Sequence, residues 1–116
     1  MYKNIFDTHA HYEDEQFDCD RDELLSSFPE NGISGVVTCG TDIITSEKSI
    51  ALAEKYPFIY GAAGVHPSST AELDEEKFAE LRVLAQSGKI VAIGEIGLDY
   101  YWEEPDKGIQ KKWFVG

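Results

Sequence analysis

Residues 35–39 read GVVTC, and residues 90–93 read IVAI. Both runs are apolar and have no polar face. A strand with one solvated face alternates apolar and polar residues, whereas a strand that is covered on both faces does not. The two runs therefore predict buried strands of a parallel sheet that is covered on both sides.

The rest of the chain fits this pattern. Apolar runs of strand length and stretches of helical spacing alternate along it. The four predicted strands are Asn4–His9, Ile33–Cys39, Phe58–Val65 and Ile90–Ile96. The predicted helices are Arg21–Phe28, Ser46–Tyr56, Glu75–Gln86 and a fourth from near Asp106 through Gln110–Val115. This β-α alternation predicts parallel strands joined by right-handed crossovers in one α/β domain, residues 1–116.

Residues that start and stop helices support these bounds. Pro29 and Pro57 end the first and second helices, because proline disfavours helix in the residue before it. For the third helix we expect Asp74 as the N-cap and Gly88 as the C-cap.

The composition is that of a globular protein, with 42% hydrophobic and 28% charged residues. The 10 basic and 22 acidic side chains give a net charge of 10 − 22 = −12. This charge argues against a broad basic surface for nucleic acid or anionic membrane. It leaves open an enzyme that binds phosphate through metal ions, because the metals supply the positive charge.

The two cysteines, Cys19 and Cys39, lie far apart and form no metal-binding motif. We expect two buried or partly buried free thiols in a reducing compartment. The first residues contain no long apolar run, so we expect no secretory signal, and no apolar stretch is long enough to span a bilayer. We therefore expect a soluble, cytoplasmic protein that does not bind membranes.

The three histidines all lie at or just past the end of a predicted strand, where parallel α/β folds place active sites. His9 and His11 alternate with Thr8 and Ala10, so both share one strand face with Asp7. A His-x-His pair on one face can bind a metal ion, and Asp7 could orient an imidazole. Two solvated histidines at a strand end are the alternative interpretation.

Two further motifs follow later strands. Gly64-Val-His-Pro67 places His66 at a strand end, where it could contact a phosphate or a metal-bound water, or bond to loop backbone. Glu95 follows a buried run, and a carboxylate there is costly unless it is paired or bound to a cation. A glutamate with two oxygens can bridge two metal ions. Asp99 could bind a ligand or cap a turn.

An aromatic group comprises Tyr100, Tyr101 and Trp102, with Trp113 and Phe114 downstream. These rings could stack on a base or sugar, but packing onto the body of the fold is the favoured interpretation.

The motifs Asp7-Thr-His-Ala-His11, Gly64-Val-His-Pro67 and Gly94-Glu-Ile-Gly-Leu-Asp-Tyr100, in this order, resemble the TatD family of metal-dependent deoxyribonucleases. The resemblance covers essentially the whole chain. It implies the first four or so units of an amidohydrolase-like (β/α)8 TIM barrel that cleaves phosphodiester bonds, typically at DNA ends or in single strands. It also implies one or two divalent ions such as Mg, Mn or Zn.

Carried over by residue, the resemblance makes His9 and His11 the first metal ligands and Glu95 the bridging carboxylate. Asp7, His66, Asp99 and Tyr100 become substrate-binding or supporting residues. The family pattern continues on later strands with two more histidines and a late aspartate that acts as general base. No histidine follows His66. We therefore expect no catalytic base in this chain, which resembles about half of the family barrel and is expected to be truncated.

Three alternatives remain open. His-x-His after a first strand also occurs in amide and lactone hydrolases. In that group a lysine would be expected at the end of the fourth strand, where this chain has Glu95. The chain could also bind metal without turnover. Finally, the open edges of a half barrel predict a homo-oligomer, in which Glu95 would approach His9 and His11 of the partner subunit.

Overall fold

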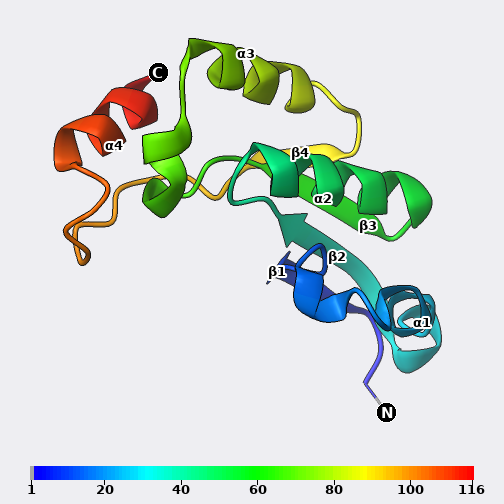
Figure 1. The fold of residues 1–116 in the computed structure, drawn as a ribbon. Helices are drawn as coiled ribbons and strands as arrows, with labels where there is room; N and C mark the ends of the chain where they lie inside the picture. The colour runs from blue at the N-terminus through cyan, green and yellow to red at the C-terminus, as the bar shows by residue number, and fades with distance from the viewer. Residues whose placement is uncertain (1) are drawn as a thin grey trace.

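The computed structural model describes residues 2–116. Its centre is a sheet of four parallel strands in the order β1-β2-β3-β4 (Figure 1). The strands are β1 Ile5–Ala10, β2 Ile33–Cys39, β3 Ile59–Ala63 and β4 Ile90–Ile93. The prediction of parallel strands that alternate with helices is confirmed. Because all four strands run the same way, their carboxyl ends lie together at one end of the sheet.

In the described residues, four α-helices and three short 3₁₀ helices accompany the strands; all but α4, which follows β4, lie between one strand and the next (Figure 1). The α-helices are α1 Arg21–Ser26, α2 Ile43–Lys55, α3 Glu75–Leu84 and α4 Lys107–Val115. The 3₁₀ helices are η1 Glu15–Phe17, η2 Pro29–Asn31 and η3 Pro67–Glu72. Among the described residues, no helix is both long enough and apolar enough to cross a membrane.

Hydrogen bonds at the helix ends explain the bounds. Helix α2 begins three residues before the predicted Ser46, because Asp42 and Thr45 form a reciprocal capping box. Asp74 caps α3 as predicted, by accepting a bond from the Lys77 N–H. The prediction of Gly88 as the C-cap is wrong: α3 ends at Leu84 and a further turn follows before β4.

The core lies between the sheet and helices α1 and α2. Its buried residues are Leu25, Phe28, Val36, Leu52, Ala53, Tyr56 and Ile59. Strand β2 contributes to it and is largely buried, as predicted. The same prediction is wrong for β4, where Val91 and Ile93 are 55% and 54% exposed. The difference arises because β4 pairs only with β3 among the described residues and forms an edge of the sheet.

The loop between β4 and α4 is tied down by one buried side chain, Gln110, which is 1% exposed. Its amide nitrogen donates to the carbonyl oxygens of Asp99 and Pro105, and its amide oxygen accepts from the Asp99 N–H. The donors and acceptors of a buried amide are costly to leave unpaired, so these bonds fix how the loop leaves the sheet.

Candidate metal centre

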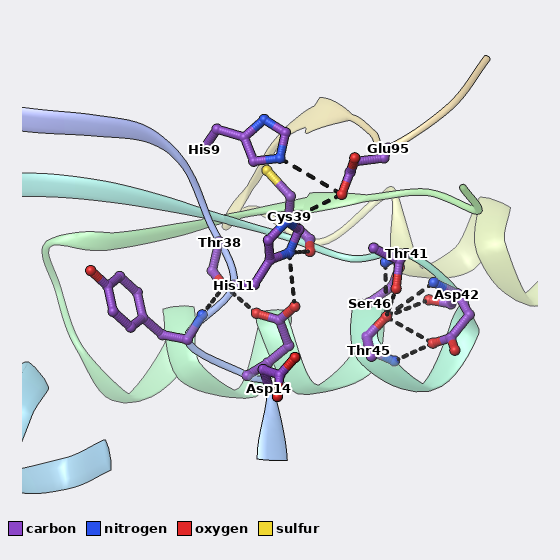
Figure 2. Close-up of polar contacts among 12 residues, drawn as sticks. His9, His11, Asp14, Thr38, Cys39, Thr41, Asp42, Thr45, Ser46 and Glu95 are labelled. Atoms are coloured by element: carbon purple, nitrogen blue, oxygen red, sulfur yellow. Dashed lines mark hydrogen bonds and ion pairs between the residues drawn. The ribbon is translucent and has the colours of Figure 1, made fainter. Parts of the chain in front are cut away.

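Three side chains converge at the carboxyl end of the sheet (Figure 2). His9 lies near the end of β1, His11 just beyond it, and Glu95 two residues beyond β4. Glu95 Oε2 lies 3.2 Å from His11 Nε2 and 3.7 Å from His9 Nε2. One potential ligand atom from each residue lies within 4.8 Å of the other two. The three groups therefore meet within a single chain.

Backbone bonds carry Glu95 back across the ends of two neighbouring strands. The Gly94 N–H donates to the Ala63 carbonyl at the end of β3 (3.0 Å), and the Glu95 N–H donates to the Gly40 carbonyl just after β2 (2.8 Å). Gly64 leaves room for this crossing. A Cβ atom at position 64 would lie 2.4 Å from the carbonyl carbon of Gly94. The position of Glu95 thus depends on a residue without a side chain at position 64.

The hydrogen bonds of His11 determine what its ring offers to the cluster. Its Nδ1 lies 2.9 Å from the Cys39 carbonyl oxygen, which can only accept, so Nδ1 carries a proton. In the neutral ring, Nε2 then presents a lone pair to Glu95 Oε2, which is also an acceptor. Two acceptors at 3.2 Å attract one another only through a proton or a cation between them.

The donor set fits a divalent cation on these grounds. It offers two imidazole nitrogens and one carboxylate oxygen, a combination that suits zinc, manganese and similar ions. The side chains of His9, His11 and Glu95 are 58%, 36% and 24% exposed, so an ion can reach them from solvent.

The other predicted site residues lie outside this cluster. The Asp7 carboxylate accepts from the His9 backbone N–H (3.1 Å) and bonds to neither imidazole. His66 Nδ1 lies 2.8 Å from the Ser68 hydroxyl and accepts from the Ser68 N–H, so this ring caps η3. Asp99 caps a turn by accepting from the Tyr101 N–H.

The aromatic residues divide into two groups. Trp113 packs against Phe78, with ring centroids 5.5 Å apart, as predicted. Tyr101 and Trp102 contact each other edge to face but are 82% and 61% exposed, so the prediction that they pack onto the fold is wrong. Tyr100 is 41% exposed. The Nζ atom of Lys107 lies 5.0 Å from the centroid of its ring.

The cysteines differ from one another. Cys39 ends β2 and is buried, and burial raises the pKa of its thiol. Cys19 is exposed, contrary to the prediction, and both thiols are free.

Sequence reasoning missed Glu13, whose carboxyl group is buried beside His11. Its signal was present but weak. It lies two residues after His11, and the apolar run of β2 contains one hydroxyl residue, Thr38, that could pair with a buried acid.

Comparison with known proteins places this arrangement in a family. The family model described as TatD related DNase matches residues 6–116. The chain belongs to this family. It is 40% identical over 110 residues to the "uncharacterized metal-dependent hydrolase YabD" of Bacillus subtilis, a match covering 95% of this chain and 43% of that protein. It is also 40% identical over 96 residues to the "3'-5' ssDNA/RNA exonuclease TatD" of Cronobacter sakazakii, covering 83% of this chain and 36% of the relative.

Solved structures of TatD proteins share the fold. A TatD family hydrolase from Entamoeba histolytica superposes with a TM-score of 0.86 at 29% identity, over 99% of this chain and 44% of that structure. The TatD homologue YJJV from Escherichia coli gives a TM-score of 0.83 at 26% identity, over 96% and 44% of the two chains. The four strands thus correspond to β/α units of the TatD barrel, and the chain spans less than half the length of these relatives.

Proposed function

We propose that this chain supplies the metal-binding part of a TatD-type hydrolase that cleaves phosphodiester bonds in nucleic acid. His9, His11 and Glu95 are the proposed ligands of one or two divalent ions. The observation that carries the proposal is the convergence of two imidazole nitrogens on one carboxylate oxygen, with His11 Nδ1 already bonded to a backbone carbonyl. This leaves Nε2 of His11 directed at the cation position.

Each proposed ligand has a distinct task. His11 is held by the Cys39 carbonyl and offers Nε2 in a fixed direction. Glu95 is held by its own backbone bond to Gly40 and offers a charged oxygen between the two rings. A divalent ion bound there would polarise a phosphate oxygen and stabilise the negative charge that develops during hydrolysis. His66, Asp99 and Tyr100 remain proposed substrate contacts, and Asp7 supports the backbone of His9.

Nucleic acid ends or single strands are the proposed substrates. Relatives of the chain are named as 3'-5' ssDNA/RNA exonucleases. The net charge of −12 opposes long contacts with duplex phosphates, because each such contact needs a positive group. A short strand end needs fewer of them.

The test combines metal binding with turnover. Isothermal titration with MnCl₂ measures affinity, and release of nucleotides from a labelled single-stranded oligonucleotide measures activity. Glu95→Ala should weaken Mn²⁺ binding by more than the roughly 10–100-fold that follows loss of a supporting contact. Glu103→Ala, which removes an equal charge from an exposed position in the same loop, should bind like the wild type.

The outcomes separate the alternatives. Metal-dependent release of nucleotides that Glu95→Ala abolishes supports the nuclease. Binding without release assigns the chain a metal-binding role and places the catalytic base elsewhere. Metal-dependent cleavage of a lactone but not of the oligonucleotide would favour the amide and lactone hydrolase class. Unchanged Mn²⁺ affinity in Glu95→Ala would refute the centre itself.

We further propose that copies of the chain associate through β1 and β4, the two edges of the described sheet. Both edges carry exposed apolar side chains: Ile5, Phe6, Val91 and Ile93 are 41–55% exposed. Since all strands are parallel, β4 of one copy can extend along β1 of the next. A folded monomer at micromolar concentration in sedimentation velocity would contradict this. The cytoplasmic location stays a prediction, to which the two free thiols lend support.

A further inference from the structure

A buried acid lies directly behind one of the proposed ligands. Glu13 is only 4% exposed, although glutamate is rarely buried without partners. Its two oxygens have separate partners. Oε1 lies 3.4 Å from His11 Nδ1, and Oε2 accepts from the Thr38 hydroxyl. Glu13 thus contacts Nδ1 of the His11 ring, whereas Glu95 lies beside Nε2 of the same ring.

Thr38 links this acid to the centre of the sheet. It lies on β2 and is 0% exposed. Its hydroxyl accepts from the Tyr12 N–H at 3.3 Å and donates to Glu13. Donor and acceptor capacities of the hydroxyl are both used, so its proton has one direction in which to point. That direction holds Glu13 Oε2 against Thr38, which is fully buried.

A second clamp holds the backbone around Glu13. The Arg21 guanidinium donates from Nε to the Tyr12 carbonyl (2.7 Å) and from Nη2 to the Asp14 carbonyl (2.7 Å). These carbonyls belong to the residues on either side of Glu13. Its side chain is therefore held by Thr38 and its backbone by Arg21, before any ligand arrives.

We propose that Glu13 is a positioning residue for metal binding by His11, an inference that rests on the proposed metal centre. The Cys39 carbonyl and Glu13 Oε1 share the Nδ1 proton and restrict rotation of the ring from two sides. The acid also polarises the Nδ1–H bond, which makes Nε2 a stronger donor to a cation. No residue that the structure describes supports His9 in this way, and its proposed ligand atom faces Glu95 from a side chain that is 58% exposed.

The experiment measures Mn²⁺ affinity by calorimetry in the wild type and in four variants of the whole chain. Glu13→Gln keeps the shape of the side chain but removes its charge. Thr38→Val removes the hydroxyl that orients Glu13, whereas Thr38→Ser keeps a hydroxyl at this position. Glu15→Gln removes an equal charge from an exposed position two residues later, at the start of η1.

Glu13→Gln and Thr38→Val should bind Mn²⁺ roughly 10-fold or more weakly, the loss expected when support of a metal-bound histidine is removed. Thr38→Ser and Glu15→Gln should bind like the wild type. A second readout needs no metal. In ¹⁵N-histidine NMR spectra of the metal-free protein, the Nδ1 proton of His11 should exchange with solvent faster in Glu13→Gln than in the wild type. Thermal unfolding of the metal-free variants checks that Glu13→Gln and Thr38→Ser remain folded.

The possible results are distinct. If the wild type binds Mn²⁺ and Glu13→Gln binds it equally well with unchanged proton exchange, the role of Glu13 is refuted while the metal centre stands. An equal loss of Mn²⁺ affinity in Glu13→Gln and Glu15→Gln would show that the effect comes from net charge alone, and would also refute the role of Glu13. If the wild type binds no Mn²⁺, the proposed function and the role of Glu13 both fail.

Discussion

Gly64→Ala should displace Glu95 without altering any proposed ligand. An added Cβ atom would lie 2.4 Å from the Gly94 carbonyl carbon, whereas ordinary contact begins at 3.4 Å. The difference, 3.4 − 2.4 = 1.0 Å, is the distance by which the backbone at Gly94 and Glu95 must retreat. Overpacking of this kind typically costs about 1–3 kcal/mol of unfolding free energy. Metal–ligand distances tolerate only about 0.2 Å, so we expect Mn²⁺ affinity to fall by about 10–100-fold.

The assay pairs urea unfolding with Mn²⁺ calorimetry. Gly88→Ala is the matched control, because an added Cβ there meets no atom within 4 Å. It should leave both the affinity and the stability close to wild type. Wild-type Mn²⁺ affinity in Gly64→Ala would refute the proposed role of Gly64, since it would show that Glu95 does not need the close crossing of the two backbones. Lower stability with unchanged affinity would refute it equally.

Three further predictions concern the rest of the chain. Gln110→Ala should lower the unfolding free energy by about 1–3 kcal/mol and speed proteolysis within residues 98–106, because it leaves buried backbone groups unpaired; urea unfolding and limited proteolysis measure this. Hydrogen bonds from Lys55, the larger effect, and from Tyr56 lower the pKa of Asp22. The ionised Asp22 carboxylate therefore stabilises the fold at neutral pH, and this stabilisation is lost as pH falls through the lowered pKa. Asp22→Asn should therefore be slightly less stable than wild type at pH 7 in thermal unfolding, with the difference vanishing in acid. Iodoacetamide at pH 8 should label exposed Cys19 before Cys39, whose thiol pKa is raised by burial, as mass spectrometry will show.

Each of these has a clear contrary result. Gln86→Ala, at an exposed position, is the control for Gln110→Ala, and equal losses in the two would contradict the role of the buried amide. A stability difference between wild type and Asp22→Asn that grows in acid would contradict the lowered pKa of Asp22. Labelling of both cysteines at one rate would contradict the burial of Cys39.

Much of the fold was predictable because local pattern determines it. The run of β2 and the cap at Asp74 follow from residue type and spacing alone. Bounds were less predictable. The first turn of α2 depends on a reciprocal bond between Asp42 and Thr45, and no hydrophobic spacing reveals that bond. The exposure of β4 depends on which strands lie beside it, and its apolar composition cannot report this.

The site residues also divide into those that local sequence pattern predicts and those that it does not. Parallel strands bring their carboxyl ends to the same end of the sheet, so position along the sequence was enough to group His9, His11 and Glu95 as candidates. The same reasoning included His66, whose ring instead bonds locally to Ser68. Position at a strand end shows that a side chain is near the carboxyl end of the sheet. The nearest polar group to that side chain decides where the side chain points.

Glu13 and Gly64 were missed for a related reason: their importance lies in contacts with residues far along the chain. A glutamate in a polar loop is ordinarily solvated, and only the approach of Thr38, 25 residues later, makes it a buried group. Gly64 is 30 residues from Gly94, and its missing side chain matters only where those backbones cross. The sequence signal for Glu13 was therefore weak, and the contact of Gly64 has no local sequence pattern.

Backbone anchors bring two of the three proposed ligands to the same end of one strand. His11 is fixed by the carbonyl of Cys39, and Glu95 by its own N–H to the carbonyl of Gly40, the next residue. Both groups are therefore hydrogen-bonded to the same end of β2, although they follow β1 and β4. With these anchors, the His11 nitrogen and the Glu95 oxygen lie 3.2 Å apart. When His11 is neutral, that geometry holds two electron-rich atoms face to face, and a divalent cation is the ligand that would turn this repulsion into binding.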